Sequence, residues 1–282
     1  MERRRFAAMG STAEILVVGD VDAAALDGAV RRIDELERRW SRFVDTSEVS
    51  ALNRSAGRPV AVSDDTVLLV RLACDAWRRT GGCFDPTVLG AVEAIGYTCS
   101  LVGPLADPRS GRVDRPSNRA RTGTCGEIVV DRVDRTVRLP ERTGFDPGGI
   151  GKGLAADLVS HDLVSEGASG GCVNIGGDLR VWGPGPGGRP WRIGIGERTV
   201  EITDVGVATS GTDRRAWFVD DELVHHLIDP LSGRPAADGP TQATVVAGSA
   251  WRAETCATAL LAGPLDAVDT HADGWGVRAL VA

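Results

Sequence analysis

Lysine is almost absent from this sequence. Of its 32 Lys and Arg residues only Lys152 is a Lys, so the remaining 31 (32 − 1) are Arg. That single Lys stands in the glycine-dense stretch 144–158, which leads into a predicted helix. Lys is a compact cation on a thin stem, glycines let a ligand approach the backbone closely, and a helix N-terminus offers free N–H groups to an anion. The stretch predicts a phosphate or pyrophosphate site; the alternative is an ordinary loop whose Lys is accidental.

The two common phosphate-binding motifs are also missing. A P-loop is excluded because Asp146 stands where its first glycine should be and Gly153 follows Lys152. The dinucleotide-binding pattern G-x-G-x-x-G fails at Leu154. The stretch is therefore a different kind of anion loop, with an acidic residue, Asp146, at its mouth.

Paired cysteines, basic stripes and long apolar runs are lacking too. The six cysteines are spread singly with no C-x-x-C pair, so we expect reduced thiols rather than a zinc site or a disulfide framework. The net charge of −7 and the scattered Arg residues argue against nucleic-acid binding. No stretch approaches the length of a membrane span, and no apolar segment follows the basic N-terminus as in a signal peptide. We therefore expect a cytoplasmic protein without a membrane span.

What the sequence does contain is typical of a globular α+β protein. Its 282 residues, 42% apolar and 25% charged, can bury a sizeable core. Predicted helices lie between groups of predicted antiparallel hairpins, and neither a repeat nor a flexible linker is visible. We expect a single domain over residues 1–282, or two intimate lobes.

Local signals place the helices and one polar loop. Asp22 and Ser63 are expected to cap helices whose apolar residues recur at about 3.6 residues, and Ser249 to cap the last helix. Residues 154–164 also predict a helix. The polar stretch 45–53 predicts a loop, either a plain connection or the rim of a ligand site.

Strand signals fill much of the rest. Residues 205–211 are expected to run from a strand into a hydroxyl-rich turn, and residues 223–228 to form a strand after a turn. The Gly-, Pro- and Arg-rich residues 103–124 predict an exposed excursion. Other predicted strands are residues 12–18, 128–130, 136–139, 171–175, 179–182, 191–195, 217–219, 244–246 and 277–281.

Oxygen-bearing side chains outside the glycine stretch are candidates for ligand or metal binding. Pro86 forces Asp85 into an extended conformation, so its carboxylate is presented from a loop; a turn with a capping Asp is the alternative. Glu254 and Thr258 lie four residues apart, on one face of the last helix. Such a pair can give Mg²⁺ two oxygen ligands, although a solvated acid and a packed Thr is the more ordinary interpretation.

Two neighbouring histidines stand in one predicted strand. His225 and His226 point to opposite faces of residues 223–228, so only one of them can face a given site. Alternation does not choose between them. With Asp229 and a nearby Ser210, one of them would suit a serine hydrolase, but the G-x-S-x-G elbow of those enzymes is absent.

A series of short motifs resembles the ApbE family, the bacterial FAD:protein FMN transferases. The motifs follow the family order along nearly the whole chain, and this order makes the resemblance specific although each motif alone is modest. The segments are 9–12 (MGST), 40–53 (WSRF to SEVSALN), 82–88 (GCFDPTV), 145–157 (FDPGGIGKGLAAD), 174–178 (NIGGD), 208–211 (ATSG), 226–233 (HLIDPLSG) and 254–258 (ETCAT).

The resemblance implies a fold, a reaction and roles for particular residues. The fold would be a mixed, largely antiparallel α+β structure with packed helices, similar to the T-fold, that binds FAD and Mg²⁺. The reaction would be Mg²⁺-dependent transfer of FMN from FAD to a Thr or Ser hydroxyl of a target flavoprotein, with release of AMP. By analogy His226 would be the base for that hydroxyl, with Asp229 beside it in the catalytic motif. The Gly151 carbonyl, Glu254 and Thr258 would hold Mg²⁺. The flavin nucleotide would be lined by Met9, Cys83, Phe84, Asp85, Lys152, Leu154, Thr209, Ser210, Gly211 and Leu227.

The sequence departs from the family pattern at several of these positions. Glu254 replaces the usual metal-binding Asp and is one methylene longer, and Gly151 replaces the usual Ala. An extra Ser interrupts the first motif, and no lipobox is present. Two other functions therefore stay open: Mg²⁺-dependent hydrolysis of FAD to FMN and AMP, and flavin binding without catalysis. Incubation with FAD separates them by whether AMP appears without an acceptor, only with one, or never.

Overall fold

A computed structural model describes residues 1–99, 122–196, 198–213, 215–219, 222–237, 239–263 and 278–281. Most of the expected excursion, residues 103–121, lies outside the described residues. Within them, no helix is both long and apolar enough to cross a membrane. The cytoplasmic location and the single domain expected from the sequence stay predictions.

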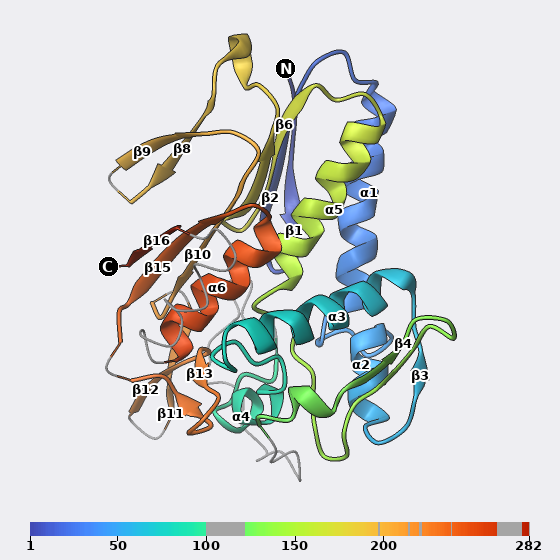
Figure 1. Ribbon diagram of the computed structural model, residues 1–282, viewed down its shortest axis with the longest axis vertical. Coiled ribbons are helices and arrows are strands. Elements are labelled where there is room, and N and C mark those ends of the chain that lie inside the picture. The colour runs from blue at the N-terminus through green and yellow to red at the C-terminus, as the bar shows by residue number, and fades with distance from the viewer. Residues whose placement is uncertain are drawn as a thin grey trace.

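The described chain is built around one antiparallel sheet (Figure 1). Its strand order is β1-β2-β6-β7-β10-β15-β16, and every neighbouring pair is antiparallel. This confirms the predicted α+β class with largely antiparallel strands. The strands are β1 (Glu2–Ala8), β2 (Ser11–Val18), β6 (Gly170–Ile175), β7 (Asp178–Trp182), β10 (Gly206–Gly211), β15 (Gln242–Ala247) and β16 (Arg278–Val281).

The two faces of this sheet are covered by different elements. In β2, Ile15 and Val17 face the main core, whereas Leu16 between them faces a second cluster on the other side. The main core is formed with three helices, α1 (Ala23–Trp40), α5 (Gly151–Ser165) and α6 (Ala250–Ala262). The second cluster is covered by the hairpin of β8 (Trp191–Ile195) and β9 (Arg198–Ile202), which stands apart from the helices in Figure 1.

Smaller elements complete the described structure. The helix α3 (Asp64–Arg79) crosses the ends of α1 and α6, and the hairpin of β11 and β12 lies below α6 at the lower left of Figure 1. The remaining elements are α2 (Glu48–Arg54), α4 (Leu89–Ala94), β3 (Val60–Ala61), β4 (Val129–Asp131), β5 (Thr136–Arg138), β11 (Ala216–Val219), β12 (Glu222–His225), β13 (Ile228–Asp229) and β14 (Arg234–Pro235), with single 3₁₀ turns at Cys125–Glu127 and Pro186–Gly188.

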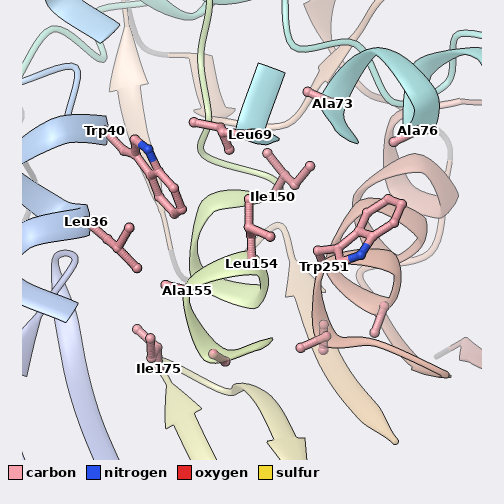
Figure 2. Close-up of a cluster of buried hydrophobic side chains, with 14 of the residues drawn as sticks. Leu36, Trp40, Leu69, Ala73, Ala76, Ile150, Leu154, Ala155, Ile175 and Trp251 are labelled. Carbon is pink, nitrogen blue, oxygen red and sulfur yellow. The ribbon is translucent and has the colours of Figure 1, made fainter. Parts of the chain in front are cut away.

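The main core is packed where the helices meet the sheet (Figure 2). Ile150 and Leu154 at the start of α5 are buried among side chains of α1, α3 and β6. Trp40, the last residue of α1, is also buried, and its indole N–H donates to the Thr66 hydroxyl of α3 over 3.1 Å. The glycine stretch therefore leads into a helix whose first turns are fixed by packing.

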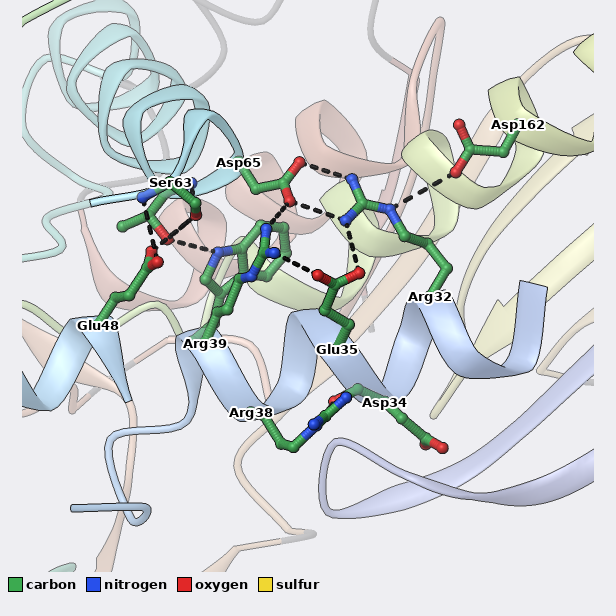
Figure 3. Close-up of polar contacts among 11 residues, drawn as sticks. Arg32, Asp34, Glu35, Arg38, Arg39, Glu48, Ser63, Asp65 and Asp162 are labelled. Carbon is green, nitrogen blue, oxygen red and sulfur yellow. Dashed lines mark hydrogen bonds and ion pairs between the residues drawn. The ribbon is translucent and has the colours of Figure 1, made fainter. Parts of the chain in front are cut away.

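A network of ion pairs joins the helices α1, α3 and α5 (Figure 3). Asp65 of α3 accepts from the guanidinium of Arg32 at 2.6 and 2.8 Å and also pairs with Arg39, both on α1. Arg32 lies 3.6 Å from Asp162 of α5. The predicted cap Ser63, which accepts from the Thr66 N–H, places Asp65 in the first turn where the network needs it.

Three local predictions are wrong. Residues 45–53 are not a loop, because Ser47 caps α2, whose Val49 and Leu52 are buried in the core. The hydroxyl-rich residues 209–211 are not a turn, because they pair with β15. The predicted strand 223–228 ends at His225, so His226 lies in a bend after β12.

The last helix is capped differently from the prediction. Ser249 precedes α6 but its hydroxyl makes no capping hydrogen bond. The carboxylate of Asp157 on α5 accepts instead from the Ala250 and Trp251 N–H groups, at 3.0 and 2.9 Å. The N-terminus of α6 is therefore capped by a side chain of α5.

Candidate functional site

A cavity of about 590 Å³ lies where the glycine stretch, α6 and the end of the sheet meet. Segments far apart in the chain contribute to its wall, from the turn after β1 to the last turn of α6. Of the residues predicted for the site, the cavity is lined by Met9, Cys83, Phe84, Asp85, Gly151, Lys152, Thr209, Ser210, Gly211, His226, Leu227, Glu254 and Thr258.

Two predicted site residues do not line this cavity. Leu154 is buried in the core, because it follows Lys152 by two residues and so points to the opposite side of α5 (Figure 2). Asp229 belongs to β13, and its carboxylate accepts from the Leu231 and Ser232 N–H groups, at 2.9 and 3.3 Å, in the following turn. Its side chain shapes a turn rather than the cavity.

Lys152 lies between two carboxylates. Its ammonium donates to Asp178 at the start of β7 and to Glu254 on α6, and the other oxygen of Glu254 accepts from the Gly153 N–H over 2.7 Å. Burial alone would lower the pKa of Lys152, but the two carboxylates outweigh burial and raise it. Burial raises the pKa of Glu254, and Lys152 opposes that rise. The group places one ammonium and two carboxyl groups in the cavity wall.

The predicted metal ligands lie close together along α5 and α6. A Cβ on Gly149 would meet the Thr258 hydroxyl at 3.0 Å, and the Ser210 hydroxyl lies 3.4 Å from that of Thr258. Among the described residues no cluster of three or more His, Cys, Asp or Glu side chains could hold a metal. The side-chain donors at this place are oxygens: the Glu254 carboxylate and the hydroxyls of Ser210 and Thr258.

Asp85 is buried and engaged by its own loop. Its carboxylate accepts from the Thr87 N–H at 2.7 Å, the Thr87 hydroxyl at 2.6 Å and the Gly123 N–H at 2.9 Å. Burial raises the pKa of Asp85, and these hydrogen bonds oppose the rise. Asp85 therefore caps its turn, as in the alternative, and also lines the cavity; its role in ligand binding stays a prediction.

His226 and Arg215 lie together on another part of the wall. The Nδ1 atom of His226 is 3.4 Å from the Arg215 carbonyl oxygen. Burial first, and then the charge of Arg215, lower the pKa of His226 to about 3, so the imidazole is neutral at pH 7. Arg215 makes no ion pair with a residue that the structure describes.

Arg42 presents a third cation at the cavity, after Lys152 and Arg215. Its guanidinium donates to the Tyr97 carbonyl over 2.9 Å, lies 3.3 Å from Asp146 and rests 4.2 and 4.5 Å from the ring centres of Phe43 and Tyr97. The side chain is 6% exposed, and its Nη2 atom has no hydrogen-bond partner in the described part of the chain. A buried donor without a partner beside a cavity suits an acceptor atom of a ligand.

Asn53 fixes the entrance to the glycine stretch from outside the cavity. Its amide donates to the Phe145 carbonyl over 3.0 Å and accepts from the Phe145 N–H over 2.7 Å, with both residues buried. Sequence reasoning placed Asn53 in a loop and assigned no role to Asp178, Arg215 or Arg42. Asp178 and Arg42 stand in the quoted motifs 174–178 and 40–53, which were an available signal; Arg215 stands in none of the motifs and gave no signal.

Known proteins of one family are similar to this chain over most of its length. A family model described as "ApbE family" matches residues 9–280. The FAD:protein FMN transferase of Vibrio cholerae is 31% identical over 268 residues, which cover 90% of this chain and 78% of that protein. The enzyme of the same name from Salmonella typhimurium is 29% identical over 269 residues, with 90% and 76% covered.

Solved structures of similar proteins share the whole fold. The crystal structure of the ApbE protein from Thermotoga maritima superposes with a TM-score of 0.86 and 27% identity, covering 99% of this chain and 93% of that one. The apo form of the flavinyl transferase ApbE from Pseudomonas stutzeri gives 0.82 and 28%, covering 99% and 90%.

Proposed function

Because the chain belongs to the ApbE family, we propose that it is a FAD:protein FMN transferase. It would transfer FMN from FAD to a Thr or Ser hydroxyl of a target protein, with AMP as the second product and with Mg²⁺. The observation that carries this proposal is the single cavity that collects the motif residues of eight separate segments of the family pattern.

The residues present fit a bound Mg²⁺. Glu254 and Thr258 are one turn apart on α6, and the N-terminal turn of α5 lies against both of them. With the Gly151 carbonyl they form an oxygen donor set, the kind that Mg²⁺ prefers. Glu254 would share its carboxylate between the metal and Lys152. When bound, the ion would neutralise charge on the phosphate groups of FAD.

The reaction that we propose is a substitution at phosphorus. The acceptor oxygen forms a bond to the phosphorus of the FMN half, and the bond from that phosphorus to the oxygen bridging to AMP breaks. AMP leaves with that oxygen, and the acceptor hydroxyl loses its proton. Nδ1 of His226 faces the Arg215 carbonyl, so Nε2 is the nitrogen that would take the proton.

The charge of Arg215 would couple FAD binding to the basicity of His226. In the free protein that charge helps to keep the pKa of His226 near 3, which makes it a weak base. A pyrophosphate beside Arg215 would neutralise the charge and let the pKa rise toward the working pH, where a general base is most effective. The histidine would become basic only when substrate is in place.

Flavin binding is the simplest test of the proposal. We expect the protein to quench FAD fluorescence on titration, and Asp85→Ala to abolish binding, because Asp85 lines the cavity and holds the loop after Cys83. Asp229→Ala is the matched control: like Asp85, Asp229 is followed by a Pro and caps a turn, but it lies outside the cavity. No binding by the wild type at tens of micromolar (about −6 kcal/mol), or equal loss in both variants, would refute the assignment.

A further inference from the structure

A second cavity, of about 830 Å³, lies on the face of the sheet opposite to the helices. We call it the outer groove; one side is the strand β8 and the other is formed by Glu14, Leu16, Cys172, Asn174, Gln242 and Thr244 of the sheet. None of the reaction steps described above uses this groove.

The floor of the outer groove is formed by side chains on one face of the main sheet. Its residues are alternate ones, for example Glu14 and Leu16 in β2, so their side chains point the same way. Leu16 pairs with Cys172 and Glu14 with Asn174 in the register of β2 and β6. The floor is therefore apolar at Leu16 and Cys172 and mainly polar at the other end, where Leu179 beside Asn174 is the apolar exception.

The opposite wall is the edge of a strand. All residues of β8 line the groove in succession, regardless of which face their side chains occupy, and no residue of β9 does. Among the described residues β8 pairs only with β9, so its other edge has unpaired N–H and C=O groups. Such an edge is suited to pairing with an extended segment of another chain.

The polar end of the outer groove meets the cavity of about 590 Å³ described above, which we call the FAD cavity because the proposed function places FAD there. Thr209 of β10 lines both, and it is paired with Thr244 on the groove floor, hydroxyl to hydroxyl at 2.9 Å. In the turn between β6 and β7, Gly176 and Asp178 line the FAD cavity while Gly177 between them lines the groove. A chain lying in the groove could pass over this turn into the cavity.

We propose that the outer groove binds the acceptor segment of the target protein as an extended strand added to β8. The segment places apolar side chains over Leu16 and Cys172 and carries its Thr or Ser at the polar end, where the hydroxyl enters the FAD cavity beside Thr209. This inference rests on the proposed transfer of FMN to a protein.

The test compares matched substitutions on the two strands of the hairpin. Ile193 and Ile202 are both half-buried and pack on the same cluster, but only Ile193 lines the outer groove. A library of short peptides with one central Thr is incubated with FAD, Mg²⁺ and enzyme, and FMN adducts are identified by mass. For the best peptide we expect Ile193→Arg to lower kcat/KM about tenfold or more, mainly through KM, and Ile202→Arg to leave it within about twofold.

FAD affinity serves as the control for folding, and a second variant tests the groove from its other side. FAD binding should be unchanged in every variant, which shows that the fold is intact. Gln242→Arg, on the opposite side of the groove, should raise KM for the peptide as Ile193→Arg does. Equal kinetics for wild type, Ile193→Arg and Gln242→Arg would overturn the groove assignment, and so would a wild type that releases AMP with a protein acceptor yet modifies no peptide. A wild type that never releases AMP would instead refute the proposed function.

Discussion

Arg215 and Lys152 show that a cation lining a site need not be available to a ligand. The charge of Lys152 is shared by Asp178 and Glu254, so it serves first to hold α5, α6 and β7 together. Arg215 has no such partner in the part of the chain that the structure describes. We therefore expect Arg215, rather than Lys152, to offer its full charge to the pyrophosphate.

The residues of the site could be predicted to unequal degrees. Lys152 stood out because it is the single Lys, and its position at the start of α5 follows from the glycines before it. Arg42 and Asn53 stand in the quoted motif 40–53, but their contacts could not be predicted because they involve distant neighbours: Phe145 is 92 residues from Asn53. Arg215 stands in no motif, so nothing distinguished it from the other Arg residues.

The two adjacent histidines give a direct test of the proposed base. His226 lines the cavity, whereas His225 ends β12 and its Nε2 lies 3.0 Å from the Ala236 carbonyl oxygen. We expect His226→Ala to lower the FMN transfer rate by about 10² to 10⁴ with FAD affinity preserved, since loss of a general base affects chemistry rather than binding. His225→Ala should keep transfer within a few fold. The reverse pattern, measured in the same transfer assay, would assign the base to His225.

The coupling between Arg215 and His226 predicts a proton uptake. The pKa of His226 is about 3 in the free protein, below the usual 6.5, so this imidazole should stay neutral down to acidic pH. FAD or inorganic pyrophosphate should raise that pKa by neutralising Arg215. NMR titration of the His226 ring protons with and without pyrophosphate measures the change, and Arg215→Gln should raise the pKa without ligand. An unchanged pKa in both experiments would contradict the coupling.

At the scale of elements, the sequence and the structure assign the cap of α6 to different residues, Ser249 and Asp157. Asp157→Ala should lower the free energy of unfolding by about 1–3 kcal/mol, because two N–H groups of α6 lose their acceptor. Ser249→Ala, the matched control, should change it by less than about 0.5 kcal/mol, since the buried Ser249 hydroxyl has no hydrogen-bond partner in the described structure. Urea denaturation measures the free energy of unfolding of both variants. A larger decrease in Ser249→Ala than in Asp157→Ala would show that Ser249 is the cap, as the sequence predicts.

The same carboxylate predicts a pH dependence of stability. Burial raises the pKa of Asp157 from 3.8 to about 6, so the folded state binds the proton more tightly than the unfolded state. The resulting stability is present below about pH 4 and is lost as the pH rises through about 6. The unfolding free energy of the wild type should therefore fall over this window relative to that of Asp157→Asn, by about 1–3 kcal/mol. Parallel curves for the two proteins would show that the pKa of Asp157 is not raised.

Two short polar segments were misassigned for a physical reason. Ser, Thr, Asp and Gly favour turns through local hydrogen bonds, which predicts a loop at residues 45–53 and a turn at 209–211. Packing overrides that preference in both places. In α2 the burial of Val49 and Leu52 stabilises a helix, and at the end of β10 pairing with β15 keeps the chain extended.

On the scale of the whole molecule, local patterns predicted most elements but not their order in the sheet. The pairing of β2 with β6 joins residues about 160 apart, for which periodicity carries no information. The resemblance to the ApbE family supplied the fold, and the structural neighbours confirm it. The outer groove follows from the assembled sheet and could not be predicted from local sequence.

The central claim is that the chain transfers FMN to a hydroxyl group rather than to water. The most direct measurement is the amount of AMP and of covalently bound FMN formed in one reaction with FAD, Mg²⁺ and an acceptor peptide or protein. We expect AMP and FMN adduct in equal amounts, little AMP without acceptor, and neither product after chelation of the metal. AMP accompanied by free FMN, or flavin bound with no AMP released, would contradict the account.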